Sequence, residues 1–395
     1  MFRYWSGAFT VPVLMLLYAG LSVLLPGKLG YPRAMTAERK KLADRTFLRL
    51  LWQCALAFAA LNFMLMQSTR LLEPSIQRGA ALAVSLAEAV LAVLLALPVE
   101  RALRSVPEAE EASVTEQAPA KVNLLLNVGQ KRPDGYHELV SIMQTVDVCD
   151  TLTVTGHTGG GGVVLTCDDP SLAVDETNLC YKAAVKLFSY TEIANDGVSI
   201  HLRKRLPMQA GLGGGSADAA AVLRALRRIY APNLPDTELE AMAAELGSDV
   251  PFCVRGGTTL TLGRGERLAP LPPLPACWFV LVKPEAAYST GKMYGLIDSR
   301  GCYDAGGAGP MADALERGDL DGVCAALRNT FERVLDPEGE TFALKRRLAA
   351  LGARGAMLSG SGSAVFGVFA DEETARMACA ALRADYPRTF CGKSR

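Results

Sequence analysis

The sequence has few residues suited to binding a transition metal. Its 395 residues include three histidines, which lie far apart at positions 137, 157 and 201. Ten cysteines are scattered along the chain, and no two of them form a CxxC pair. Zinc sites need cysteine or histidine ligands clustered at short spacings. We therefore expect no zinc site, and the scattered cysteines are typical of free thiols in a reducing compartment.

The sequence also lacks an excess of charge of either sign. It has 41 basic and 41 acidic residues, which gives a formal net charge of zero. Proteins that bind nucleic acid usually carry a basic excess on the domain that contacts phosphates. We therefore expect no nucleic-acid partner. Composition leaves the oligomeric state open.

Charge is absent from long segments of the N-terminal third. No charged residue lies between positions 3 and 28 or between 49 and 70, and the segment 79–99 contains only Glu88. A helix of about 20 mostly apolar residues is long enough to span a bilayer. The sequence therefore predicts an all-α transmembrane domain of three helices over residues 1–106. Three buried helices of a soluble core are the alternative.

Positive charge predicts the orientation of these helices. The loop between the second and third apolar segments carries only Arg70 and Arg78. The loop between the first and second carries many more basic residues: Lys28, Arg33, Arg39, Lys40, Lys41 and Arg45. Loops rich in Lys and Arg face the cytoplasm. We therefore expect residues 4–99 to cross the inner (cytoplasmic) membrane as a multi-pass lipid-bilayer segment, with the N-terminus outside and the rest of the chain in the cytoplasm.

The role of this segment stays open. An ionisable residue inside a bilayer marks either a functional site or a protonated group that faces a neighbouring helix, and Glu88 fits both descriptions. Residues 29–35 and 43–45 loosely resemble the cytoplasmic loop of small SdpI-type bacterial membrane proteins, over too short a stretch to imply a function. Residues 107–117 are acidic and polar, and we expect them to form a flexible linker.

A glycine-rich loop dominates the remaining sequence. Alternating apolar residues predict one strand over 120–128, with Lys121 and Asn123 on its other face, and a second strand over 198–202. The glycine loop follows, and then an alanine-rich helix over 216–229. A strand, a glycine loop and a helix N-terminus together bring backbone N–H groups close to phosphates. The spacing fits neither a Walker A loop nor a dinucleotide fingerprint.

Three side-chain roles are left open by the residues alone. Ser216 stands where a helix N-cap belongs, but its hydroxyl is equally suited to a phosphate or Mg²⁺. Asp249, in the segment LGSDVPF, is either a cap for the next turn or a catalytic carboxylate. A second glycine-rich turn at 359–363 precedes an apolar strand and is either a tight turn or a segment that packs on another loop.

Together these segments resemble the signature motifs of the GHMP kinase superfamily. The pairing of PAKVN at 119–123 with RPDGYH at 132–137 is, within that superfamily, similar to the 4-diphosphocytidyl-2-C-methyl-D-erythritol kinases. The resemblance runs from about Ala118 to near the C-terminus. It implies an α+β two-lobe kinase fold after the transmembrane segment, with an N-terminal ATP-binding lobe over 118–270 and a C-terminal lobe over 275–395.

The resemblance implies a reaction and two catalytic residues. The reaction is ATP-dependent phosphorylation of the 2-hydroxyl of a cytidine-diphosphate-linked polyol in non-mevalonate isoprenoid precursor biosynthesis, with ATP and Mg²⁺ as cofactors. Asp249 matches the base that takes the hydroxyl proton, and an alcohol becomes a good nucleophile only as its proton leaves. Lys121 matches a cation that keeps the carboxylate ionised and offsets charge on the phosphoryl group.

The resemblance also implies the binding residues. Tyr136 and Tyr294 are expected as the two walls of a cytosine sandwich, and His137 as the residue that reads the base edge. No metal ligands stand out beyond Ser216 and Asp249. The loop expected to hold the triphosphate consists of Pro207, Met208, Gln209, Ala210, Gly211, Leu212, Gly213, Gly214, Gly215, Ser216 and Ala217. The residues expected to bind the substrate are Asn123, Tyr136, His137, Lys204, Thr290 and Tyr294.

Other functions remain compatible with the sequence. A GHMP kinase acting on a different alcohol would carry the same general motifs. A membrane adaptor would bind nucleotide without chemistry, although intact Lys121 and Asp249 argue against it. The membrane segment could also have a transport or immunity role of its own, and the fusion could be an artefact of the gene model.

Overall fold

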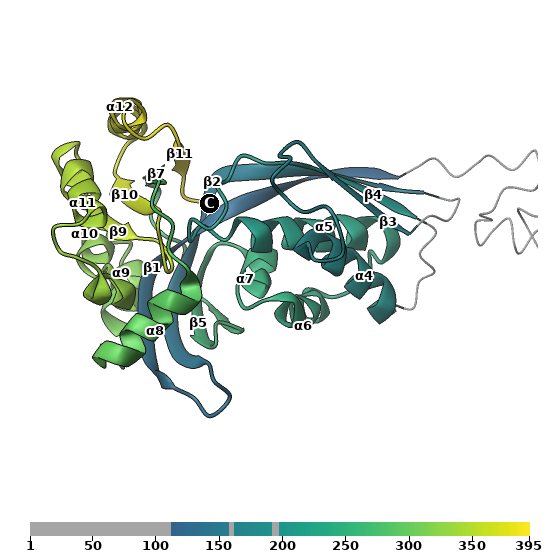
Figure 1. Ribbon diagram of the computed structural model, residues 1–395, viewed down its shortest axis with the longest axis horizontal. Helices are drawn as coiled ribbons and strands as arrows, with labels where there is room; N and C mark the ends of the chain where they lie inside the picture. The colour runs from purple at the N-terminus through teal and green to yellow at the C-terminus, as the bar shows by residue number, and fades with distance from the viewer. Residues whose placement is uncertain (1–111, 158–161, 192–196) are drawn as a thin grey trace, which may run out of the picture. The chain divides into compact units, whose positions relative to one another are not determined.

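The computed structural model describes residues 112–157, 162–191 and 197–395 (Figure 1). The predicted transmembrane domain over 1–106 and the first residues of the predicted linker lie outside the described residues. Within the described part of the chain, no helix combines the length and the apolar character that crossing a membrane requires.

The first lobe is built on a long antiparallel pair of strands. Strand β1 (Ser113–Lys131) pairs with β2 (His137–Gly156) along almost its whole length. The sheet order is β3-β4-β2-β1-β8, and β5 and β6 extend it from β2. Both strands expected from the alternating pattern are confirmed, within β1 and β4. The remaining strands are β3 (Val163–Cys167), β4 (Val198–Arg203), β5 (Thr258–Gly263), β6 (Arg267–Pro270) and β8 (Arg328–Asn329).

The linker prediction over 107–117 is wrong for its second half. Strand β1 begins at Ser113, and residues 113–117 pair with residues 151–155 of β2. Glu116 is buried and forms ion pairs with Arg224 at 3.2 Å and Arg228 at 2.8 Å. The acidic composition of residues 107–117 predicted that Glu116 would be solvated. The sequence did not reveal its basic partners, because they lie more than a hundred residues further along the chain.

Four helices pack against the first sheet, and Figure 1 shows them grouped on one of its faces. The apolar face of β2 and β4, with Leu152 and Ile200, meets the small side chains of α5, which allow close approach. Helix α5 begins at Gly214, two residues earlier than expected, and its N-cap is Gly213 without a side-chain bond. The helices are α4 (Leu179–Thr191), α5 (Gly214–Tyr230), α6 (Asp236–Leu246) and α7 (Val250–Arg255).

The second lobe contains an antiparallel sheet in the order β11-β7-β10-β9. Its strands are β7 (Trp278–Val282), β9 (Gly355–Leu358), β10 (Val365–Phe369) and β11 (Thr389–Lys393). Its helices are α8 (Thr290–Arg300), α9 (Gly309–Glu316), α10 (Leu320–Ala325), α11 (Glu340–Ala350), α12 (Glu372–Arg383) and the 3₁₀ helix η2 (Thr330–Val334). The predicted two-lobe α+β fold is therefore confirmed.

Strand β1 contributes to the cores of both lobes. Its residues Val122 and Leu124 are fully buried in one apolar cluster with Phe279 of β7 and Phe366 of β10. The short strand β8, which comes from the second lobe, pairs in parallel with β1. The two lobes therefore share a strand and an apolar core.

A buried ionic cluster joins the first sheet to helix α5. Lys204, which follows β4, donates to Asp150 of β2 at 2.6 Å and to Asp218 of α5 at 2.8 Å. The second oxygen of Asp150 accepts the backbone N–H groups of Arg205 and Leu206. The cluster therefore ties together the two ends of the glycine loop. Burial raises the pKa of Asp218 to about 8, with Asp150 adding to the shift and Lys204 opposing it.

This raised pKa makes stability depend on pH. An unfolded aspartate titrates near pH 3.9, so the native state binds more protons between roughly pH 4 and 8. The contribution of Asp218 to the free energy of unfolding is therefore complete below about pH 4 and lost as the pH rises through about 8. The neutral variant Asp218→Asn should show a flatter decline in that free energy from neutral to alkaline pH. Urea titrations followed by circular dichroism at stepped pH would measure it.

The matched control is Asp313→Asn, which removes an exposed carboxylate from α9. Its pH profile should equal that of the wild type. Equal slopes for Asp218→Asn and the wild type would contradict the assignment.

Candidate functional site

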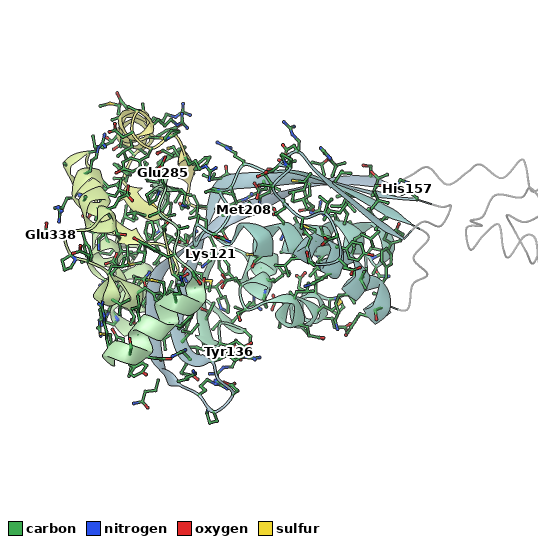
Figure 2. The ribbon with its side chains drawn as sticks, in the orientation of Figure 1. Lys121, Tyr136, His157, Met208, Glu285 and Glu338 are labelled. Atoms are coloured by element: carbon green, nitrogen blue, oxygen red, sulfur yellow. The ribbon has the colours of Figure 1, made fainter. Side chains whose placement is uncertain are left out.

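A cavity of about 1050 Å³ lies between the two lobes. Its walls come from β1 and β2, the glycine loop, the start of α7, helix α8 and the turn after β9. Figure 2 shows Lys121 where the ribbons of the two lobes meet and Tyr136 toward the tip of the β1–β2 hairpin. The predicted residues that line this cavity are Lys121, Asn123, Tyr136, His137, Gln209, Gly211, Gly213, Ser216, Asp249, Thr290 and Tyr294.

A second pocket of about 450 Å³ lies on the other side of the glycine loop. Residues 207–216 all line it, together with Leu172, Thr177 and Asn178 from the segment before and at the start of α4. Four loop residues, Gln209, Gly211, Gly213 and Ser216, line both hollows. Ala217, the last residue of the predicted loop, lines neither pocket; it is buried within α5, and its backbone N–H donates to the carbonyl oxygen of Gly213 at 2.8 Å.

The turn after β9 holds the glycine loop in place. Ser359 donates through its hydroxyl to the carbonyl oxygen of Gly211 at 2.9 Å, and the backbone N–H of Ala364 donates to the carbonyl of Ala210 at 3.0 Å. Gly211 has φ +77°, and a Cβ there would lie 2.1 Å from the carbonyl oxygen of Ser359. Only glycine fits this position. The turn therefore packs on the loop, the second of the two roles that the sequence left open.

Lys121 and Asp249 meet in the main cavity. The Nζ atom of Lys121 lies 3.3 Å from Oδ2 of Asp249 and 2.7 Å from Oδ1 of Asn123. Lys121 is buried, whereas a third of the Asp249 side chain is exposed. Asp249 occupies the N-cap position of α7 but makes no side-chain capping bond. Its carboxylate is therefore available to the cavity beside a fixed cation, which favours the catalytic alternative over the capping one.

An aromatic cluster forms the far end of the cavity. The rings of His137 and Tyr294 stack with centroids 4.8 Å apart, and Tyr294 meets Phe331 edge-on at 5.0 Å. Tyr136 is 54% exposed and lies beneath the guanidinium of Arg264 at 5.0 Å. The two tyrosines predicted as opposite walls therefore have different partners in this structure. Burial raises the pKa of Tyr294 to about 12, which keeps its hydroxyl protonated.

Lys204 does not reach the main cavity. It lines the second pocket, its side chain is 7% exposed, and both its carboxylate partners are more deeply buried. Asp150 and Asp218 outweigh the effect of burial and raise the pKa of Lys204. The substrate-binding prediction for Lys204 is therefore corrected to a structural role at the base of the glycine loop. Thr290 does line the main cavity, and its hydroxyl lies 2.9 Å from that of Ser361.

Sequence reasoning missed several residues of the site. Arg264, in the turn between β5 and β6, lines the main cavity beside Tyr136. Asp298 of α8 lines it as well and contacts His137 at 2.7 Å. Asp298 follows Tyr294 by one helical turn, and that i,i+4 spacing is the sequence signal that could have identified it.

Oxygen donors for a magnesium ion are few but suitable. Magnesium is commonly held by one or two protein oxygens together with phosphates and water. The hydroxyl of Ser216 and the carboxylate of Asp249 both line the main cavity. Among the residues that the structure describes, no group of three or more His, Cys, Asp or Glu side chains is arranged to hold a metal. The two oxygens present in the cavity are of the kind that hold magnesium together with phosphates.

Family models match both lobes. The GHMP kinases N terminal domain matches residues 178–257, and the GHMP kinases C terminal model matches residues 311–388. A solved homoserine kinase from Cytophaga hutchinsonii shares the fold with a TM-score of 0.57 at 19% identity, covering 73% of this chain and 96% of that one.

Relatives with higher identity share one name. The 4-diphosphocytidyl-2-C-methyl-D-erythritol kinase of Moorella thermoacetica is 43% identical over 290 residues, which cover 70% of this chain and 97% of the relative. The enzyme of the same name from Exiguobacterium sibiricum is 40% identical over 272 residues, 69% of this chain and 94% of the relative. A crystal structure of 4-(cytidine 5'-diphospho)-2C-methyl-D-erythritol kinase has 36% identity and a TM-score of 0.61, and covers 71% of this chain and 99% of its own. The chain belongs to the 4-diphosphocytidyl-2-C-methyl-D-erythritol kinase family of GHMP kinases.

Proposed function

We propose that this chain transfers the γ-phosphoryl group of ATP to the 2-hydroxyl of 4-diphosphocytidyl-2-C-methyl-D-erythritol, in the synthesis of isoprenoid precursors by the non-mevalonate route. The observation that carries the proposal is the 3.3 Å pair of Lys121 and Asp249 beside a glycine-rich loop. The identity of the substrate is inferred from the family to which the chain belongs.

The chemistry assigns different tasks to the two charged residues of this pair. Asp249 accepts the hydroxyl proton as the substrate oxygen bonds to the γ-phosphorus and the bond from that phosphorus to the β–γ bridging oxygen breaks, which releases ADP. Lys121 offsets negative charge on the transferred group and holds the carboxylate in place. Asn123 accepts from Lys121 and donates to Ser141 at 2.9 Å, so it orients the cation.

The two hollows suit the two ends of ATP. The second pocket has room for the nucleoside, and the glycine loop separates it from the cavity that holds Asp249. A triphosphate that follows the loop would be bound by backbone N–H groups and by the N-terminus of α5, and would bring its γ-phosphoryl group toward Lys121. Ser216, which lines both hollows, lies on that path.

Magnesium would be held by the phosphates with Ser216 and Asp249 as the available protein oxygens. When bound, it supplies neutralisation of the phosphate charge. These oxygens support the magnesium part of the proposal.

The aromatic end of the cavity suits the cytidine of the substrate. Tyr136 is largely exposed and offers a ring face to a base, whereas His137 and Tyr294 stack on each other in the same cavity. A stacked base is worth about 1–3 kcal/mol per contact by analogy with single-strand binders. Thr290 and Ser361 add hydroxyl groups between the aromatic end and the glycine loop.

We further propose that residues 1–106 attach this kinase to the inner membrane through residues 4–99, with the kinase in the cytoplasm and the N-terminus outside. The three apolar segments and the basic loop between the first two support this proposal. The topology would give the kinase access to cytoplasmic ATP.

The variant Asp249→Asn tests the base. It keeps the shape of the side chain but does not accept the proton, so kcat should fall by about 10²–10⁴-fold. Release of ADP from the purified full chain with ATP, Mg²⁺ and 4-diphosphocytidyl-methylerythritol measures the loss. Asp313→Asn, on α9, should match the wild type. Full turnover by Asp249→Asn would refute the assigned base, and no turnover by the wild type would refute the substrate.

The variant Gly211→Ala tests the loop. A Cβ would clash with the carbonyl oxygen of Ser359 and alanine disfavours φ +77°. A loop displaced by about 1 Å should cost roughly 10²-fold in kcat/KM for ATP. Gly307→Ala is the matched control, because a Cβ there would meet nothing within 4 Å and the residue lines neither pocket, so its kcat/KM for ATP and its melting temperature should equal those of the wild type. An unaffected Gly211→Ala enzyme would show that the loop does not carry the triphosphate.

Cell fractionation tests the membrane attachment. The full chain should remain in the membrane pellet after washing with alkaline carbonate, whereas a chain beginning at residue 107 should be released, because it lacks every apolar segment. A full chain that washes off would argue against an integral membrane segment.

A further inference from the structure

The ring of His137 is held from several sides. Its Nε2 atom lies 2.7 Å from Oδ1 of Asp298, and its side chain is 6% exposed. The ring of Tyr294 covers one face at 4.8 Å, and the ring of Tyr303 lies 6.4 Å away. Asp298 and Tyr294 are both on α8, so one helix determines where the imidazole lies.

Asp298 is itself fixed as a hydrogen-bond acceptor. The hydroxyl of Tyr303 donates to its Oδ1 at 3.1 Å, and Lys131 approaches its Oδ2 at 3.9 Å. The hydrogen bond from His137, with smaller effects from Tyr303 and Lys131, lowers the pKa of Asp298. Asp298 is therefore a carboxylate at neutral pH, and a carboxylate only accepts hydrogen bonds.

An acceptor at this place determines which nitrogen of His137 carries hydrogen. Because Oδ1 of Asp298 only accepts, Nε2 of His137 must donate, and in the neutral ring Nδ1 is then an acceptor. The structure records no protein hydrogen bond to Nδ1 within its described residues, and His137 lines the main cavity.

We propose that Asp298 is a positioning residue: it fixes the hydrogen of His137 on Nε2 and thereby leaves Nδ1 as the acceptor through which His137, already expected to read the base edge, meets the exocyclic amino group of cytosine and selects cytidine over uridine. The inference rests on the proposed function, which supplies the cytidine. Cytosine carries an amino donor at the position where uracil carries a carbonyl acceptor. If uridine bound, its carbonyl oxygen would face Nδ1 of His137, and neither acceptor would have a donor. A site that recognises its substrate through a hydrogen bond rejects the analogue that lacks the matching group.

The wild-type protein gives the first test. The chain contains three histidines, so ¹⁵N-histidine labelling gives a simple spectrum in which a His137→Gln variant identifies the His137 signals. Ring-nitrogen shifts, followed over a pH titration to the range in which the ring is neutral, should show hydrogen on Nε2 alone in that range. Hydrogen on Nδ1 of the neutral ring would overturn the proposal without any variant of Asp298.

The second test compares binding of CDP and UDP by calorimetry, which requires no turnover. The wild type should prefer CDP, and Asp298→Asn should reduce that preference by roughly tenfold, because the amide can donate to Nε2 and move the hydrogen to Nδ1. The affinity for ATP, measured as a control ligand, should stay unchanged in this variant. The control variant Asp313→Asn should keep the wild-type preference.

The outcomes separate this inference from the proposed function. A folded Asp298→Asn protein with an unchanged ratio of CDP to UDP affinity would overturn the positioning role even if the kinase is active. Loss of CDP affinity and ATP affinity together would also overturn it, since it would show general damage to the cavity. If the variant does not fold, the ring-nitrogen shifts of the wild type decide. Absence of wild-type turnover, together with a CDP preference that Asp298→Asn reduces, would refute the proposed reaction and support the positioning role.

Discussion

The site depends on one constraint, which is that strand β1 is packed into both lobes at once. The apolar residues of β1 lie in a core shared with β7 and β10, while Lys121 and Asn123 from the same strand project into the cavity. A buried lysine has little freedom of its own, so its position follows from the packing of its neighbours. The geometry of the Lys121–Asp249 pair is thus set by core packing as much as by local contacts.

The glycine loop is held by contacts that are remote in sequence. Lys204 bonds to two aspartates and so ties the ends of the glycine loop to the sheet and to α5. Ser359, from the other lobe, bonds to the middle of the loop. The backbone N–H of Lys121 also donates to the carbonyl of Leu212 at 2.9 Å. A loop rich in glycine has much conformational entropy to lose, and these contacts restrict it before a ligand arrives. Preorganisation of this kind reduces the cost of binding a triphosphate.

The sequence was informative where a local pattern carries the meaning. Alternation identified β1 and β4, the glycine pattern identified the loop that lines both pockets, and the motif resemblance singled out Lys121 and Asp249, which the structure places 3.3 Å apart. The sequence was misleading where a charged residue has its partner far away in the chain. Glu116 lies in a strand and not in a linker, and Lys204 forms ion pairs with Asp150 and Asp218. Local spacing contains no information on which charges will be buried together, because that depends on how strands pair.

The same limit applies to the aromatic end of the cavity. Tyr136 and His137 are adjacent in sequence, and neighbouring residues cannot share a face on an extended chain. Their partners, Arg264 and Tyr294, come from a hairpin turn and from the other lobe. The residue types were therefore predictable, whereas their pairing required the fold.

The shared strand also has a consequence for how the polypeptide is made. A ribosome completes β1 long before it reaches β7 and β10, the strands that cover the apolar residues of β1 in the finished molecule. Contacts between segments so far apart in sequence form slowly, because a long loop must close first. During synthesis, β1 and β2 therefore expose an apolar surface until most of the chain has emerged, and transiently exposed surface of this kind makes a chain prone to aggregation.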